Sequence, residues 1–334
     1  MFDLEKQIMV SFPGLGIDEF ILNKIVLEIP IFGGIEIRWY GLIISLGMIL
    51  AFLYAGYRSK SYNIIFDDVI DLGLFSVIFG VIGARLYYVI MEIESYHTFK
   101  DVIAIWNGGL AIYGGVIGGA IAVFCVAKYK SRKKPNISFP RCADIILPGV
   151  MIAQSLGRWG NFFNGEAFGG QVAERHPLYF MRMGLKSGNT IHDFGTTETV
   201  YVHPTFLYES LWNLLGFVLI NLLWKKKKFD GEAGLWYVTW YGFGRMFIEG
   251  LRTDSLYVGN IRISQLIGFV CFIVGLGLIV AIRIIVHKRS KVAVNQEAST
   301  AKVEEVIDTE DAEIEKITDE NSVIEEEKEN GEDN

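Results

Sequence analysis

Long apolar stretches constrain this chain more than any other feature of its sequence. Hydrophobic residues make up 51% of its 334 positions, and they lie in long runs rather than in the alternating pattern of a half-buried strand. A helix crosses the hydrocarbon core of a bilayer with roughly 20 mostly apolar residues, because lipid offers no partner to an unpaired backbone amide. The sequence therefore predicts an all-α polytopic membrane protein with about seven transmembrane helices, near residues 40–57, 69–91, 108–127, 143–156, 205–224, 234–250 and 263–286.

Basic residues between the apolar stretches predict the orientation. Lys and Arg follow the first, third, fifth and seventh stretches, at 58–60, 128–134, 225–228 and 287–291. The loops on the other side carry little basic excess, so the positive-inside rule places the N-terminus outside and the C-terminus in the cytoplasm. The lysine run at 225–228 also fits a lipid-headgroup or nucleic-acid patch. A stop signal beside a span is the simpler interpretation, and no nucleic-acid partner is expected.

Composition divides the chain into two parts. Residues 1–290 are predicted to form the transmembrane domain, with an outside loop near 161–203 that is too long for a simple connector. Residues 291–334 are predicted to be a disordered cytoplasmic tail, because 297–334 alone holds sixteen Asp and Glu against three Lys. The first twenty residues lack the basic start and apolar core of a cleavable signal peptide, so the first span is expected to act as its own signal.

Polar residues of the predicted spans gather on one side of the membrane once this orientation is applied. Ionisable groups at membrane depth are costly and usually mark a pathway or a site. Six spans contribute to the group, which consists of Tyr40, Arg85, Tyr113, Arg158, Asn161, His203, Arg245 and Glu249. The sequence therefore predicts a polar site near the outer leaflet.

Each of these residues also has a purely structural interpretation. Tyr40 fits an interfacial aromatic belt, and Arg85 could extend to lipid headgroups. Arg245 and Glu249 are four residues apart and fit an ion pair within one helix. His203 could cap a helix. Paired glycines within 108–119 most simply form a close helix-packing face.

The segment 157–169 is harder to interpret as structure alone. Its sequence, Gly-Arg-Trp-Gly-Asn-Phe-Phe-Asn-Gly-Glu-Ala-Phe-Gly, places charged and amide side chains among glycines where a span should end. Glycine lets backbone amides approach a ligand closely, arginine presents a planar fork to phosphate oxygens, and asparagine both donates and accepts hydrogen bonds. This combination indicates a site for a phosphate at the depth of lipid headgroups.

The same segment resembles the signature of a known family, the prolipoprotein diacylglyceryl transferases. The similarity rests on Gly157-Arg158-x-Gly160-Asn161-Phe162-x-Asn164-x-Glu166-x-x-Gly169. Further motifs follow in the family's order between about residues 35 and 285, namely Arg38-Trp39-Tyr40-Gly41, Gly83-Ala84-Arg85-Leu86, Gly108-Gly109-Leu110, His203-Pro204-Thr205 with Tyr208-Glu209, and Tyr241-Gly242-x-Gly244-Arg245 with Glu249 and Arg252. One position departs, because Tyr113 stands where many members have histidine. An imidazole base is not expected there.

The resemblance implies a bacterial plasma-membrane enzyme, with 1–290 as its catalytic domain. It would transfer an sn-1,2-diacylglyceryl group from phosphatidylglycerol to the cysteine thiol of a preprolipoprotein lipobox, forming a thioether and releasing glycerol-1-phosphate. Its partners would be phosphatidylglycerol, lipobox peptides and other membrane lipids, while the oligomeric state stays open. No cofactor is expected, and no His, Asp and Glu cluster has the spacing of a metal site. The alternatives are a transporter of a small anionic solute, although no internal repeat is visible, and a non-catalytic scaffold or insertase.

Within this interpretation, two arginines would bind the phosphate group of the lipid. Arg158 and Arg245 would stabilise the charge that builds as the bond from carbon to phosphate oxygen breaks. Glu249 would hold Arg245 in place. The candidate substrate-binding residues are Tyr40, Arg85, Asn161, Asn164, Glu166, Gly169 and Tyr241. Asn161 and Asn164 would orient the headgroup, and Glu166 would hold the signature loop in place.

The substrate thiol needs a proton acceptor or a cationic field, since its reference pKa is near 8.5. His203 is the candidate by its ordinary pKa, and Tyr113 is the candidate by its position in the third span. The sequence ranks the two equally.

Overall fold

The computed structural model describes residues 3–30, 35–253, 255–294 and 296. The chain divides into two compact units, Met1–Ile279 and Val280–Asn334, and the boundary falls within the last helix, Ile263–Val294. The first unit holds the site. Most of the predicted acidic tail lies outside the described residues.

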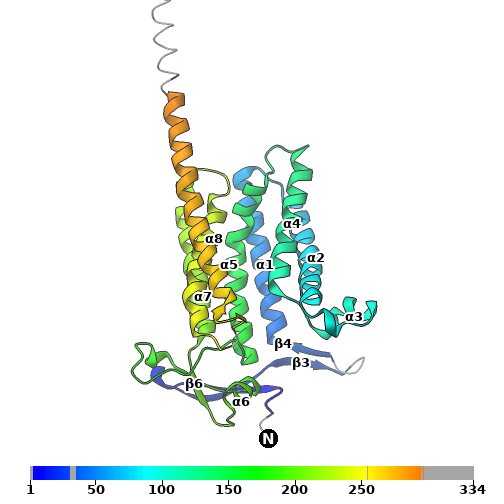
Figure 1. Ribbon diagram of the computed structural model, residues 1–334, viewed down its shortest axis with the longest axis vertical. Helices are drawn as coiled ribbons and strands as arrows, with labels where there is room; N and C mark the ends of the chain where they lie inside the picture. Colours follow the sequence, from blue (N-terminus) through cyan, green and yellow to red (C-terminus); the bar gives the residue numbers. More distant parts are fainter. Residues whose placement is uncertain (1–2, 31–34, 254, 295, 297–334) are drawn as a thin grey trace, which may run out of the picture. The chain divides into compact units, whose positions relative to one another are not determined.

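The predicted spans each overlap a helix of the structure. Before the last helix, the chain forms α1 (Trp39–Ser59), α2 (Phe66–Met91), α4 (Ile112–Ser131), α5 (Phe139–Asn164), α7 (Thr205–Leu223) and α8 (Glu232–Ile248), with two short helices, α3 (Phe99–Ile103) and α6 (Gly188–Phe194), in the connections (Figure 1). Within the described ranges, five helices are long and apolar enough to cross a membrane: α1, α2, α4, α7 and Ile263–Val294. The protein is therefore a polytopic membrane protein. α5 is more polar and α8 has 17 residues, so the count of seven spans stays a prediction.

Small residues let the helices pack closely, while large apolar side chains such as Leu46, Ile49 and Leu53 of α1 remain exposed, as expected of a surface that faces lipid. α2 and α4 are an example. A Cβ on Gly114 would lie 2.2 Å from the Gly83 carbonyl oxygen, and a Cβ on Gly118 would lie 2.3 Å from the Phe79 carbonyl oxygen. The predicted packing role of these glycines is confirmed.

Gly118→Ala is expected to destabilise the protein by about 1–3 kcal/mol, because the added methyl group meets backbone that cannot rotate away. Thermal unfolding in detergent measures the effect. Gly277→Ala is the matched control, since nothing lies within 4 Å of a Cβ at that helical position. Equal unfolding temperatures for the two variants would contradict the tight α2–α4 contact.

Short strands outside the helices correct the expectation of an all-α fold. β1 (Gln7–Phe12), β2 (Ile17–Asn23), β5 (Met183–Lys186) and β6 (Val200–Val202) form an antiparallel sheet in the order β2-β1-β5-β6. Two hairpins, β3 (Ile25–Ile29) with β4 (Ile35–Arg38) and β7 (Tyr257–Val258) with β8 (Ile261–Arg262), complete the strands. The predicted outside loop is therefore folded, because β5 pairs with β1 of the distant N-terminal segment on one side and with β6 on the other.

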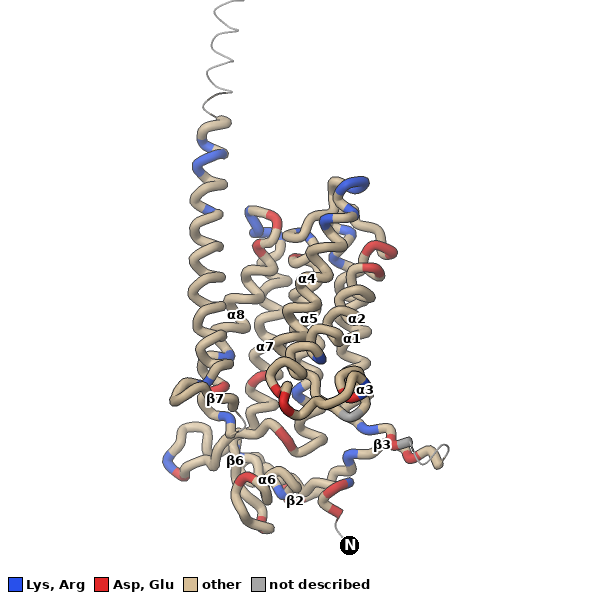
Figure 2. Tube along the Cα trace, turned by 45° about the vertical axis from the view of Figure 1, so that its right-hand side comes forward, with Lys and Arg blue, Asp and Glu red and all other residues tan. Residues whose placement is uncertain are grey.

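A compact apolar core joins this sheet to the helices. Ile8 and Val10 of β1 and Leu185 of β5 are buried together with Phe162 of α5 and Phe206 of α7, whose rings stack 4.4 Å apart. The sheet thus covers the end of the helices at which the 157–169 segment lies, and most charged residues of the helices lie toward their two ends (Figures 1 and 2).

Candidate functional site

The segment 157–169 begins on the last turns of α5 and turns back on itself. The helix ends at Asn164, and Gly165 follows in a left-handed conformation with φ 65°. Glu166 then accepts hydrogen bonds from the side-chain amides of Asn161, at 2.9 Å, and Asn164, at 3.2 Å. Asn161 Oδ1 in turn accepts a hydrogen bond from Arg158 Nη1 at 3.4 Å. The predicted supporting contact of Glu166 with this loop is therefore present.

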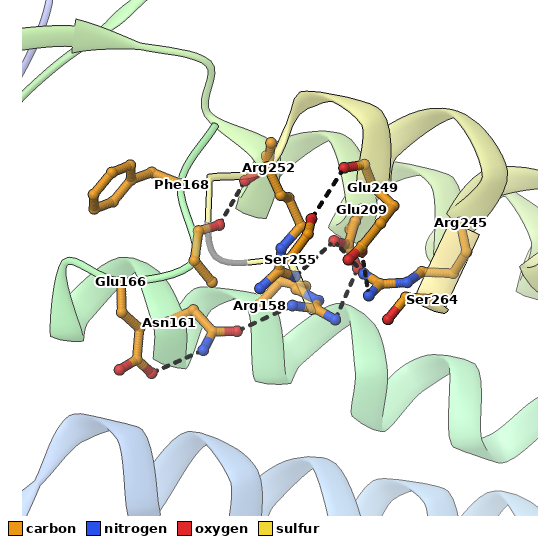
Figure 3. A network of polar contacts seen from close by, with 12 residues as sticks. Arg158, Asn161, Glu166, Phe168, Glu209, Arg245, Glu249, Arg252, Ser255 and Ser264 are labelled. Atoms are coloured by element: carbon orange, nitrogen blue, oxygen red, sulfur yellow. Dashed lines mark hydrogen bonds and ion pairs between the residues drawn. The ribbon is translucent and has the colours of Figure 1, made fainter. Parts of the chain in front are cut away.

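A buried carboxylate lies at the centre of the site. Glu209 of α7, 3% exposed, forms ion pairs with Arg158 Nη2 at 2.8 Å, Arg245 Nη1 at 3.0 Å and Arg252 Nη1 at 3.3 Å (Figure 3). The three guanidinium groups come from α5, from α8 and from the turn after α8, so the tertiary fold alone brings them together. We call Glu209 with these three residues the arginine cluster.

A second buried carboxylate, directly after α8, supports the arginine cluster. Glu249 Oε2 lies 2.5 Å from Arg245 Nη2, which is the predicted contact between residues four apart. The Glu249 carbonyl oxygen accepts hydrogen bonds from Arg262 Nη1 at 2.5 Å and from Ser255 Oγ at 3.4 Å. Glu249 is 2% exposed, so its charge is compensated by Arg245 rather than by water.

Gly169 forms a close backbone contact that no other residue would fit. Its N–H donates to the His203 carbonyl at 2.9 Å, and a Cβ there would lie 2.6 Å from His203 Cβ and 2.8 Å from the Leu251 carbonyl oxygen. An isolated bridge also pairs Gly169 with Arg252. The predicted binding residue Gly169 therefore joins the signature segment to His203 and to the arginine cluster.

His203 itself is buried beside two other polar rings. Its ring lies 4.8 Å from that of His176, edge to face, and its Nδ1 lies 3.4 Å from the Tyr208 hydroxyl. Burial, and then the charge of His176, hold the pKa of His203 below its ordinary value. The imidazole is therefore neutral at pH 7 and able to accept a proton.

The lowered pKa of His203 predicts how stability depends on pH. As pH falls below the unfolded-state value of about 6.5, the unfolded chain takes up a proton before the folded one does, so stability present above this value is lost as pH falls toward the folded pKa. Unfolding temperatures measured between about pH 5 and 8 should decrease toward acid, and His203→Gln should make this slope less steep. An unchanged slope in the variant would contradict the assignment.

Arg85 lies in a different group of contacts. Its guanidinium donates, over 2.6–3.3 Å, to the carbonyl oxygens of Asp101, Val102, Ala104, Gly108 and Gly109. Arg85 thus fixes the segment between α2 and α4, and its role in substrate binding stays a prediction.

Tyr113 reaches the neighbourhood of the arginine cluster through a serine. Its hydroxyl lies 2.7 Å from Ser264 Oγ, and Ser264 is drawn beside Arg245 in Figure 3. A Cβ on Gly268, one turn further along the same helix, would lie 3.1 Å from Arg245 Cβ, which supports this placement.

The two remaining candidate tyrosines pack against the helices that carry the site. Tyr40 lies against α5, where a Cβ on Gly160 would approach its Cδ2 to 2.9 Å. Tyr241 lies one turn before Arg245 on α8 and stacks on Tyr237 at 5.8 Å. Their contacts with substrate stay predictions.

Two members of the arginine cluster have no role in the sequence-based interpretation, which uses them only as part of the resemblance. Glu209 is an acidic residue inside an apolar helix. Because a charged group in such a helix is energetically costly, the sequence could have indicated Glu209 as a functional residue. Arg252 lies beyond the end of α8, and no periodicity of the sequence indicates that it turns back to contact Glu209.

The helices and the arginine cluster together define a polytopic membrane protein with partly buried arginines and buried carboxylates at one end of its helices. The profile of the prolipoprotein diacylglyceryl transferase family matches residues 26–281. Phosphatidylglycerol–prolipoprotein diacylglyceryl transferase 1 of Clostridium perfringens is 43% identical over 272 residues, which are 81% of this chain and 97% of the relative. The transferases of Clostridium novyi (40% over 260 residues, 78% and 95%) and Listeria welshimeri (39% over 249 residues, 74% and 86%) are also similar. The chain belongs to the prolipoprotein diacylglyceryl transferase family.

Proposed function

We propose that this protein transfers the diacylglyceryl group of phosphatidylglycerol to the lipobox cysteine of a preprolipoprotein at the arginine cluster. Membership of the family supports the reaction over the transporter and scaffold alternatives. The proposed position of the active site rests on one observation: Arg158, Arg245 and Arg252 all form ion pairs with the single carboxylate of Glu209. Guanidinium groups so arranged offer charge-assisted hydrogen bonds to a phosphate.

The chemistry requires cations more than it requires a nucleophile of the protein. The substrate thiolate attacks C3 of the diacylated glycerol, a carbon–sulfur bond forms, and the bond from C3 to the phosphate oxygen breaks. The electron pair stays on that oxygen, and glycerol-1-phosphate leaves. Arg158 and Arg245 stabilise the growing negative charge because they are held in place before the reaction, at fixed distances from Glu209 and Glu249.

The thiol proton passes to His203 or to Tyr113. The neutral state of His203 at pH 7 supports the first. The second requires Tyr113 to be ionised before it accepts the proton, and the position of its hydroxyl, 2.7 Å from Ser264 Oγ, supports it. Asn161 and Asn164, held by Glu166, orient the headgroup.

The site faces the outer leaflet of the bacterial plasma membrane in this proposal. The lysine-rich segments at 128–134 and 225–228 lie at the ends of α4 and α7 that point away from the sheet, and the positive-inside rule assigns such ends to the cytoplasm (Figures 1 and 2). With seven spans, the N-terminus is outside and the C-terminus inside. Both substrates, phosphatidylglycerol and the preprolipoprotein, would then reach the arginine cluster laterally.

The test is an assay of the purified full chain in liposomes that contain phosphatidylglycerol and a lipobox peptide. Mass spectrometry should detect a peptide that carries a diacylglyceryl group, together with released glycerol phosphate. A peptide with serine in place of the lipobox cysteine is the matched control and should stay unmodified. A folded protein that forms no product, and instead moves a small anion across sealed vesicles, would refute the proposal.

A further inference from the structure

A small cavity lies beside the arginine cluster, between α7 and α8. Glu209 and Asn213 of α7 line it, together with Tyr241, Arg245 and Ile248 of α8. The cavity volume is about 10 Å³, measured as the space available to the centre of a water-sized sphere. This is close to the space that one water molecule or one hydroxyl group needs. The cavity therefore fits a single small polar group next to the proposed phosphate position.

Asn213 brings an unused hydrogen-bond acceptor to this cavity. The residue is 2% exposed, and its Oδ1 has no hydrogen-bond partner among the described residues. A buried acceptor without a donor is costly, and such groups in native proteins are normally satisfied by water or by a ligand. Asn213 follows Glu209 by one helical turn, so both present acceptor oxygens on the same side of α7.

Two tryptophans fix the position of Asn213 relative to Arg245. The rings of Trp212 and Trp240 stack 4.2 Å apart, and each indole N–H donates to the backbone carbonyl of the other residue, at 3.1 and 2.9 Å. Gly244 permits this contact, since a Cβ there would lie 2.2 Å from Trp212 Nε1. The reciprocal bonds set the register of α7 against α8, so the cavity is formed before any ligand enters.

The acceptors indicate which headgroup suits the cavity. A neutral hydroxyl group can donate to Asn213 Oδ1, whereas an ammonium group would bring a further cation toward Arg245. Phosphatidylglycerol carries such hydroxyl groups on the glycerol attached to its phosphate. We infer that Asn213 Oδ1 accepts a hydrogen bond from a headgroup hydroxyl and so makes the enzyme select a glycerol headgroup. This inference rests on the proposed binding of the phosphate at the arginine cluster.

The test compares two lipid donors, phosphatidylglycerol and the otherwise identical phosphatidylpropanol, whose three-carbon headgroup has no free hydroxyl. The wild-type protein should prefer phosphatidylglycerol by about 10–100-fold in kcat/KM, because the second donor leaves the buried acceptor unpaired. Asn213→Leu, which keeps the side-chain size, should reduce this preference to within about threefold. Gln154→Leu is the matched control. This variant also removes a buried side-chain carbonyl that has no hydrogen-bond partner in the described part of the chain, but Gln154 does not line the cavity. It should keep the wild-type preference for phosphatidylglycerol.

Each result decides between the inference and its alternatives. A wild-type protein that uses both donors equally well overturns the inference and leaves the proposed function standing, whereas a wild-type protein that forms no product refutes the function itself. A folded Asn213→Leu protein with the full preference would mean that the cavity holds only water. If Asn213→Leu does not fold, Asn213→Ala and the wild-type donor comparison decide the same question.

Discussion

Arg245→Ala is expected to lower kcat for diacylglyceryl transfer by about 10²–10³-fold, as the loss of one preorganised charge-stabilising donor does in other enzymes. Arg245 is the guanidinium that contacts both buried carboxylates, Glu209 at 3.0 Å and Glu249 at 2.5 Å. Arg245→Lys should recover only part of the loss, because lysine restores the charge but not the planar fork. Single-turnover assays with phosphatidylglycerol and a lipobox peptide, followed by mass spectrometry, measure both variants.

Arg141→Ala is the matched control for this experiment. Arg141 also pairs with a carboxylate, Asp230, at 2.7 Å, but it lies near the other end of α5 and is about one third exposed. Its removal should leave the transfer rate close to that of the wild-type protein. An Arg245→Ala protein that unfolds normally and transfers at the wild-type rate would remove Arg245 from the proposed mechanism.

Glu209→Gln is expected to destabilise the folded protein by about 3–5 kcal/mol, the usual cost of removing one partner from a buried ion pair. The carboxylate is 3% exposed and compensates charge on Arg158, Arg245 and Arg252, so an amide would leave these guanidinium groups repelling one another. Unfolding in detergent, monitored by circular dichroism, gives the difference. The transfer rate should fall as well, since the arginines lose their fixed positions.

The surface pair of Glu36 with Arg38 provides the comparison for Glu209. Glu36 lies 2.7 Å from Arg38, and both side chains are substantially exposed, so Glu36→Gln should cost about 1 kcal/mol or less. The double variant Glu209→Gln with Arg158→Gln should be more stable than the sum of the two single effects predicts, because it removes a charge together with its counter-charge. Strict additivity would show that the two residues do not interact.

Much of the polar site could be predicted from the sequence because each signal is local. An arginine or an asparagine at the end of an apolar stretch is visible without any structure, and the orientation of the stretches places Arg158, Asn161 and Arg245 on one side. Their partners are not local. Glu209 contacts residues of α5, of α8 and of the following turn, and Asn213 becomes notable only because its acceptor is buried beside Arg245. Whether Arg85 has a structural role could be judged only once the backbone carbonyl groups that it contacts were known.

The sequence by itself determined that this chain forms apolar helices in a membrane and belongs to its family, because hydrophobic run length and a contiguous signature are properties of neighbouring residues. Only the tertiary structure decided that the N-terminal strand β1 pairs with 183–186, since strands of a few residues gain stability from partners far along the chain. It also decided that three arginines share one carboxylate. Burial makes that arrangement costly unless every charge is compensated, and compensation depends on distances in space rather than on positions in the chain.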